Sequence, residues 1–302
     1  MQPATRFPRT DSVSRRSPTS RRAAHIALFL GLCLAVAGCS KFKILYSFTG
    51  EAIESAAESH LDLSEADEAA FVDRKVDEVV LWHRAEMLPK YAAFLDAQAA
   101  VLERDAVTEA TVGDAMQGLR RLLEDTVEGG SPYIAAVLVR HSAPDRLDHL
   151  RERMAEKLAE RLEELDKPRA ERVADRTARI VKNFERFTGE LNAGQRLLVR
   201  RYAEATADEV DAWLRNRAVR QQALADFLAD RPDEAGIAAF TTRMLISPHE
   251  VVGLEHEAFS ATRWAKLRTL MFDVLVSLTD AQRAEMADTL RSYADDMVDL
   301  SS

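Results

Sequence analysis

The fold class follows from residues 72–102, which read VDRKVDEVVLWHRAEMLPKYAAFLDAQAAVL. Apolar residues recur in this stretch mostly at spacings of three and four, which places them on one face of a helix. The helix that they predict begins near residue 64 and continues for roughly 40 residues. Pro89 lies inside it. Because proline has no backbone N–H and crowds the preceding turn, we expect a kink or a break near residues 85–88.

Signals for helix starts recur along the rest of the chain. A capping box places a hydroxyl or amide side chain three residues before a residue that can return the hydrogen bond. Four segments have a pattern of this kind: Ser64–Asp67, Asn192–Gln195, Thr206–Glu209 and Thr279–Gln282. Each of them predicts the first turn of a helix.

Proline and glycine give the remaining boundaries. Ser142–Asp145 and Pro168 are expected to open helices, Gly129-Gly130 to end one, and Ser131-Pro132 to open the next. No stretch alternates apolar and polar residues as a strand does. We therefore expect an all-α fold, a single multi-helix domain of about eight to ten helices.

The first 38 residues have the three parts of a secretory leader. An arginine-bearing region ends at Arg22, an apolar run follows from Ala23 to Ala37, and small residues precede Cys39. The run of 15 residues is shorter than the roughly 20 that a membrane span needs. We therefore predict a signal peptide over 1–38, a lipidated amino terminus with a short tether over 39–60, and the helical domain over 61–302.

The segment Val36-Ala37-Gly38-Cys39 resembles the lipobox of bacterial lipoproteins. This resemblance implies that Cys39 accepts a diacylglyceryl group, becomes the first residue and anchors the protein to a membrane. Ser40 and Lys41 follow without an aspartate, which by the same resemblance implies sorting to the outer membrane, facing the periplasm.

Charge and cysteine content narrow the range of partners. The whole chain has a formal net charge of −9, and residues 1–38 carry six arginines against one aspartate, so removing this +5 segment leaves −14. A domain this acidic repels phosphate backbones, and we expect no nucleic-acid partner. The only cysteines are Cys33, in the segment expected to be removed, and Cys39, so the mature protein is expected to have no disulfide and no free thiol.

The mature chain also resembles a family of uncharacterised all-helical lipoproteins of Gram-negative bacteria, known as a domain of unknown function. The resemblance rests on Cys39 with nearby Tyr46, on Leu61–Ser64, on Trp82–Ala92 (WHRAEMLPKYA) and on Arg263–Arg283. No activity is assigned to that family. The resemblance therefore implies a location and a fold, and leaves the mechanism open.

The segment around Pro89 is the best candidate for a binding or structural site. It gathers chemically different side chains within three turns: Trp82, His83, Arg84, Glu86, Pro89 and Tyr91. His83 and Glu86 are three residues apart, so they share a helix face and could form an acid–base pair or two metal ligands. His83 also lies on the apolar stripe, where a buried, hydrogen-bonded histidine that supports a kinked helix is the preferred interpretation.

Other histidines give no strong metal signal. His249 and His256, with Glu250 and Glu255, are seven residues apart, about two helical turns, which one ion cannot bridge directly. His141 and His149 are eight apart. We expect no metal and no cofactor, and the sequence contains no catalytic motif of a known class.

Two further patterns keep alternatives open. Leu278–Gln282 has the leucine-threonine-x-x-glutamine pattern of small helical envelope-stress proteins that act as periplasmic chaperones, and Leu191–Gln195 is a looser copy. Residues 151–179 alternate in charge as a solvated helix does, although leucines over 147–165 would also suit a coiled coil.

The leading hypothesis is a non-catalytic, outer-membrane-anchored module that binds a protein or another envelope component. The alternatives are a periplasmic chaperone and a hydrolase that uses His83 and Glu86.

Overall fold

The computed structural model describes residues 41–104 and 107–302. This part of the chain is 88% helical, has no strand and forms one domain, which confirms the predicted all-α class. It contains eleven helices when adjoining segments are joined, slightly above the expected number. The predicted signal peptide, 1–38, and Cys39 lie outside the described residues.

The bounds of the helical segments are as follows. In chain order they are α2 (Lys41–Ser47), α3 (Thr49–Glu58), α4 (Ala66–Trp82), the π-helical turn η2 (His83–Met87), α5 (Leu88–Arg104), α6 (Glu109–Arg140), α7 (Pro144–Glu163), the short 3-10 turn η3 (Glu164–Asp166), α8 (Arg169–Thr188), α9 (Ala193–Thr206), α10 (Glu209–Ala229), α11 (Glu234–Ile246), α12 (His249–Val252), α13 (Leu254–Val276) and α14 (Asp280–Ser301).

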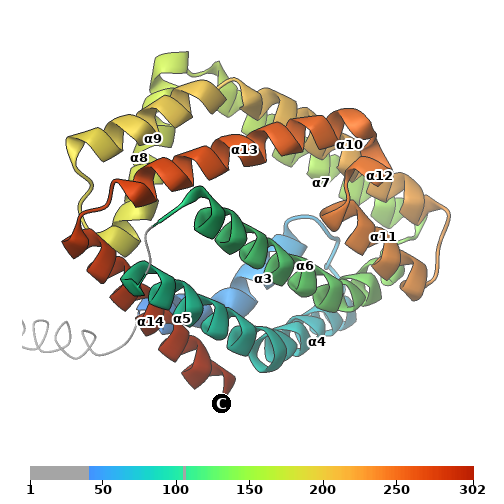
Figure 1. The fold of residues 1–302 in the computed structure, drawn as a ribbon. Helices are drawn as coiled ribbons and strands as arrows, with labels where there is room; N and C mark the ends of the chain where they lie inside the picture. Colours follow the sequence, from blue (N-terminus) through green and yellow to red (C-terminus); the bar gives the residue numbers. More distant parts are fainter. Residues whose placement is uncertain (1–40, 105–106) are drawn as a thin grey trace, which may run out of the picture.

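Helices that are far apart in the sequence lie side by side. The last helix, α14, packs along α5, while α11 packs along α6 and α10 along α7. In Figure 1, α6 runs between α13 on one side and the α5–α14 pair on the other, with α8 and α9 at one end. Helices α5, α6, α8, α13 and α14 therefore enclose a common region.

Four clusters of buried residues hold the described helices together, and the smallest, made of Val173, Ala203 and Ala207, joins α8 to the end of α9. The largest joins α6, α8, α9 and α13 and includes Met116, Val181, Val199 and Val274. A second cluster joins the end of α6 with α7, α10 and α11. The third lies between α5 and α14 and is made of Ala99, Leu102, Ala287 and Leu290. Residues of the first and third clusters also line the cavity described below.

The predicted long helix with an irregularity before Pro89 is confirmed. The helix runs through α4, η2 and α5, and the N–H of Leu88 donates to the carbonyl of His83, five residues earlier. Pro89 follows directly and has no N–H to donate. A π-helical turn at this point widens the helix where proline would crowd a regular turn.

The predicted end of a helix at Gly129-Gly130, with a new start at Ser131-Pro132, is wrong. Helix α6 continues from Glu109 to Arg140. Gly129 serves packing instead, because a Cβ atom there would lie 1.9 Å from Cζ2 of Trp82. The close approach of an indole, rather than a turn, explains this glycine.

Two of the four predicted capping boxes form. Asn192 and Gln195 exchange side-chain and backbone hydrogen bonds at the start of α9, and Thr279 and Gln282 do so at the start of α14. A further capping box, which was not predicted from the sequence, forms between Thr108 and Thr111 at the start of α6.

The other two predicted capping boxes do not form. The N-cap of α4 is Glu65, without a side-chain bond, and the N–H of Ser64 donates to the carboxylate of Asp62 at 3.1 Å. Thr206 is the last residue of α9, where its hydroxyl donates to the carbonyl of Tyr202 at 2.8 Å. Helices do begin near both segments, but other residues start them.

The amino-terminal segment from Lys41 onward is helical and packs on the end of the chain. Lys43 forms ion pairs with Asp296 and Asp299 of α14. The ring of Phe42 lies 5.6 Å from that of Tyr293, and Tyr46 is 7% exposed. The part of the predicted tether that the structure describes therefore belongs to the folded domain.

An ion pair also joins α4 to α6. The carboxylate of Glu68, whose side chain is only 10% exposed, accepts from Nη2 of Arg140 at 2.6 Å. The Arg140 guanidinium lies 4.3 Å from the centroid of the Phe71 ring. The hydrogen bond from Arg140 is the main cause that lowers the pKa of Glu68 below its usual value.

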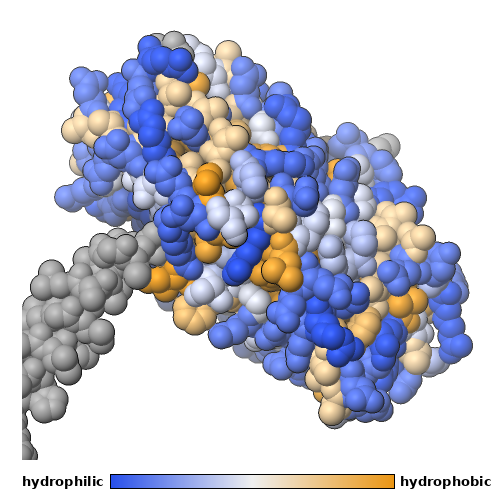
Figure 2. All heavy atoms as spheres, turned by 90° about the horizontal axis from the view of Figure 1, so that it is seen from below, coloured by the Kyte–Doolittle hydropathy of each residue, from blue (hydrophilic) through white to orange (hydrophobic). Residues whose placement is uncertain are grey.

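One face of the molecule is mainly polar. Figure 2 shows hydrophilic residues over most of the face seen there, with smaller apolar patches among them. Among residues 41–104 and 107–302, no helix is both long and apolar enough to cross a membrane.

Candidate functional site

The cluster predicted from the sequence lies where α2 meets the π-helical turn. The Tyr46 hydroxyl is 2.9 Å from Nδ1 of His83, and the two rings are stacked with centroids 5.8 Å apart. The Arg84 guanidinium lies 5.5 Å from the centroid of the Tyr46 ring. His83 and Arg84 therefore face the amino-terminal helix.

Trp82 and Tyr91, at the two ends of the same segment, contact α6. The Trp82 ring lies 6.2 Å from that of Tyr133 and against Gly129, and the Tyr91 hydroxyl is 2.9 Å from that of Thr126. These aromatic residues fasten the irregular helix to its neighbour.

His83 and Glu86 have different surroundings. His83 is half-buried, and burial lowers the pKa of its imidazole below the usual value, which favours the neutral form. Glu86 and Pro89 are exposed, and Glu86 has no hydrogen bond or ion pair with another described residue. The segment connects α2, α5 and α6 and supports the turn before Pro89, and neither His83 nor Glu86 lines the cavity described next.

The remaining histidines are separated. His141 is buried, and its Nδ1 is 3.0 Å from the carbonyl of Val137. His256 is also buried, and burial, with a smaller effect of Arg220, lowers its pKa. In the described part of the chain, no group of three His, Cys, Asp or Glu side chains is placed to hold a metal ion.

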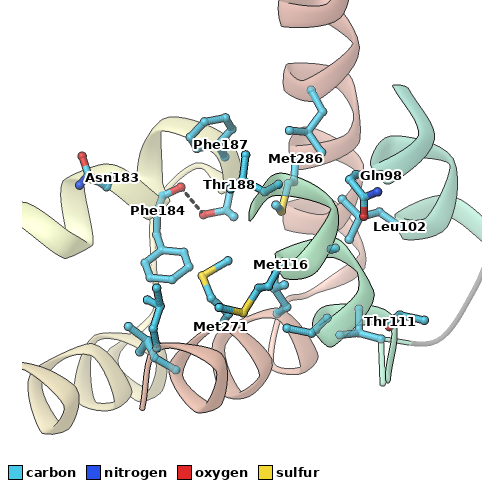
Figure 3. A pocket seen from close by; sticks show the side chains of 18 of the residues that line it. Gln98, Leu102, Thr111, Met116, Asn183, Phe184, Phe187, Thr188, Met271 and Met286 are labelled. Atoms are coloured by element: carbon cyan, nitrogen blue, oxygen red, sulfur yellow. Dashed lines mark hydrogen bonds between the residues drawn. The ribbon is translucent and has the colours of Figure 1, made fainter. Parts of the chain in front are cut away.

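An apolar cavity lies between α5, α6, α8, α13 and α14, and Tyr202 of α9 also lines it. Its volume is about 720 Å³, within the usual range of about 300–1,000 Å³ for small-molecule sites. Figure 3 shows Phe184, Met116 and Met271 grouped around its centre, with Met286 and Phe187 on the opposite side. The Thr188 hydroxyl in this wall donates to the carbonyl of Phe184 at 3.1 Å.

The charged groups of this cavity come from one helix. Among the 25 residues that line it, only Arg176 and Arg179 of α8 are charged, and none carries a carboxylate. The Arg176 guanidinium lies 5.7 Å from the centroid of the Tyr202 ring. Its Nε is buried and has no hydrogen-bond partner among the described residues. The cavity is therefore apolar with a cationic edge.

The sequence reading missed this cavity for a physical reason. Lining residues such as Val112, Met116 and Leu270 lie on the same apolar helix faces as core residues, so spacing cannot distinguish a filled core from a hollow one. The one sequence signal for the cavity was the position of Arg176 and Arg179 beside an apolar helix face. The alternating charge of residues 151–179 instead suggested a helix exposed to solvent.

The two leucine-to-glutamine patterns meet in space. Gln195 Nε2 donates to Gln282 Oε1 at 2.9 Å, and Gln282 Nε2 donates back to Gln195 Oε1 at 3.0 Å. Their leucines, Leu191 and Leu278, are 2% and 4% exposed. Each amide also accepts from the backbone of its own helix cap. These segments thus form a paired, buried connection between the starts of α9 and α14.

These features define a class: an all-helical single-domain protein with an apolar cavity between its helices. Residues 59–255, more than half of the chain, match a family of unknown function, DUF6279. The chain belongs to this family, as its resemblance to an uncharacterised all-helical family led us to expect. The match includes Trp82–Ala92, while Cys39 and Arg263–Arg283 lie outside it. Comparisons with curated proteins and with solved structures gave no match.

Proposed function

We propose that this protein is an outer-membrane-anchored lipoprotein of the cell envelope that binds an envelope component in its apolar cavity without transforming it. The observation that carries the proposal is a cavity of about 720 Å³ whose walls are mainly apolar. An apolar hollow of this size is costly to leave in contact with water, which favours a bound apolar ligand.

The chemistry of the lining supports binding rather than catalysis. The residues that line the cavity include no His, Cys, Asp, Glu or Lys, the types that most often act as nucleophile or general base. The hydroxyl of Thr188 is bonded to a backbone carbonyl. Binding requires only the shape and the apolar surface.

The proposed anchor is Cys39, at the end of the lipobox-like segment. Helix α2 begins at Lys41, two residues later, and packs on α14. A lipid on Cys39 would therefore hold the whole domain close to the bilayer. Such a position suits a protein that takes up or delivers an apolar component at the membrane surface.

Binding is tested with the protein lacking residues 1–39, because every contact described above lies within residues 41–302. The uncharged dye N-phenyl-1-naphthylamine should fluoresce strongly on binding. Ala115 lines the cavity and Ala110 is an exposed residue of the same helix outside it. Ala115→Trp should abolish most of the fluorescence and Ala110→Trp should leave it intact. Equal binding by both variants would refute the cavity as the site.

The anchor is tested in cells. The full chain should incorporate labelled palmitate and sediment with outer membranes, while Cys39→Ser should incorporate none. Unchanged labelling of Cys39→Ser, or absence of label from the unmodified protein, would contradict the lipoprotein proposal. The result of the dye-binding test would not be affected.

A chaperone is the second candidate, favoured by the leucine-threonine-x-x-glutamine pattern. The hydrogen-bonded amide pair of buried Gln195 and half-buried Gln282 gives these residues a role in the fold that needs no client protein. The chaperone alternative predicts that the purified domain suppresses aggregation of unfolded clients, and that Ala115→Trp leaves this unchanged. A hydrolase that uses His83 and Glu86 remains a weaker alternative, since Tyr46 engages Nδ1 of His83.

A further inference from the structure

We infer that the cavity binds a single-chain amphiphile with an anionic head, such as a long-chain carboxylic acid, and that Arg176 and Arg179 hold the head. The inference rests on the proposed binding function and specifies its ligand class. It derives from the sign of the charges at the cavity, the missing partner of Arg176 and the kind of apolar side chains opposite α8.

The charge at the cavity is opposite to that of the protein. The chain has a formal charge of −9, yet the lining has two arginines and no carboxylate. Arg176 and Arg179 are three residues apart on α8, so they share one face of the helix. Two guanidinium groups beside apolar walls form a site where a carboxylate is attracted and its chain is sheltered from water.

Arg176 lacks the partner that its neighbours have. Earlier on the same helix, Arg169 and Arg172 both pair with Asp208, at 3.0 and 3.7 Å. Arg176, in contrast, forms no ion pair with another described residue, and its Nε, like that of Arg172, is buried without a hydrogen-bond partner there. A buried polar group without a partner is destabilising. An anionic head at the edge of the cavity would supply the missing acceptor.

The opposite wall suits a flexible chain. Met116 of α6, Met271 of α13 and Met286 of α14 line the cavity from the helices that face α8, as Figure 3 shows. Methionine is unbranched and polarisable, so its side chain adapts to ligands of variable conformation. The charged groups all lie on α8, whereas α13 and α14 contribute only apolar lining residues. This separation matches a ligand with one polar end and one apolar chain.

The test compares ligands that differ only in the head. Dodecanoic acid and dodecan-1-ol would each be titrated, below micelle formation, against bound N-phenyl-1-naphthylamine on the protein lacking residues 1–39. A charged hydrogen bond to arginine predicts that the acid displaces the dye at a concentration about tenfold lower. Arg176→Gln and Arg179→Gln should each reduce this preference, with little effect on the alcohol.

The matched control is Arg268→Gln, because Arg268 is exposed on α13 and lies outside the cavity lining. It should keep the full preference for the acid, and circular dichroism should confirm that all variants are folded. Equal displacement by acid and alcohol would overturn the inference, as would equal loss of the preference in Arg268→Gln. Displacement by monomeric diacyl phosphatidylglycerol but not by dodecanoic acid would also overturn the single-chain assignment. In each of these cases dye binding still stands, whereas absence of dye binding would refute the proposed function itself.

Discussion

Gly129 and Gly130 are adjacent in the middle of α6, and alanine at each should have opposite effects on stability. A Cβ at Gly130 would meet nothing within 4 Å, whereas one at Gly129 would lie 1.9, 2.6 and 2.8 Å from three atoms of the Trp82 ring. Gly130→Ala should therefore stabilise the protein by about 0.5–1 kcal/mol, the usual advantage of alanine over glycine inside a helix.

Gly129→Ala gains the same helix propensity, but the indole of Trp82 must move. Overpacking of this kind costs about 1–3 kcal/mol, and three overlapping ring atoms place the cost near the upper end. The propensity terms cancel between the two variants, so the difference between them is the cost of displacing Trp82, about 2–3 kcal/mol. For a domain of this size that corresponds to a difference in Tm of about 5–10 °C.

Thermal and urea unfolding followed by far-ultraviolet circular dichroism measures this difference. Tryptophan fluorescence gives a second readout, since displacement of Trp82 also alters its contact with Tyr133. The reasoning would be refuted if Gly129→Ala were as stable as Gly130→Ala, because the glycine would then have no role in the approach of the indole.

Three further predictions concern polar contacts. Gln195→Ala and Gln282→Ala should each destabilise by about 1–3 kcal/mol, and urea unfolding of the double variant should show less than the sum, since both remove one amide pair. The pKa of Glu68 is lowered by Arg140, so Glu68→Gln should be less stable than the unmodified protein at pH 7. The difference in free energy of unfolding should decrease as the pH falls below about 4.5. A constant difference between pH 7 and 3 would contradict this prediction. The pKa of His83 is lowered by burial, so its neutral form contributes stability above about pH 6.5 that is lost as the pH falls. The free energy of unfolding of His83→Gln should therefore change less between pH 7.5 and 5.5 than that of the unmodified protein. An unchanged dependence on pH would count against this prediction.

The sequence was most informative where one local signal decides the outcome. The proline at position 89 implied an irregular turn, and the structure has a π-helical turn directly before it. The boxes at Asn192–Gln195 and Thr279–Gln282 are self-contained, since both partners lie within four residues. Such features depend on few residues and little on the rest of the fold.

Errors arose where a distant residue decides. Gly129 has the signature of a helix end, but Trp82, far earlier in the chain, determines its role. The same holds for the cavity, whose walls come from six helices and whose cationic edge is recognisable only once Arg176 is seen beside Tyr202 and the apolar lining. Periodicity identifies the apolar face of a helix but not what that face meets.

The pairing of α14 with α5 and α2 also governs the order in which the molecule can assemble. Ribosomal synthesis proceeds from the amino end, so α5 emerges long before α14 exists. Until Asp280–Ser301 arrives, Ala99 and Leu102 lack the surface that Ala287 and Leu290 provide in the finished protein. The docking of α14 on α5 therefore comes late in synthesis, and premature termination ahead of α14 would leave an uncovered, aggregation-prone intermediate.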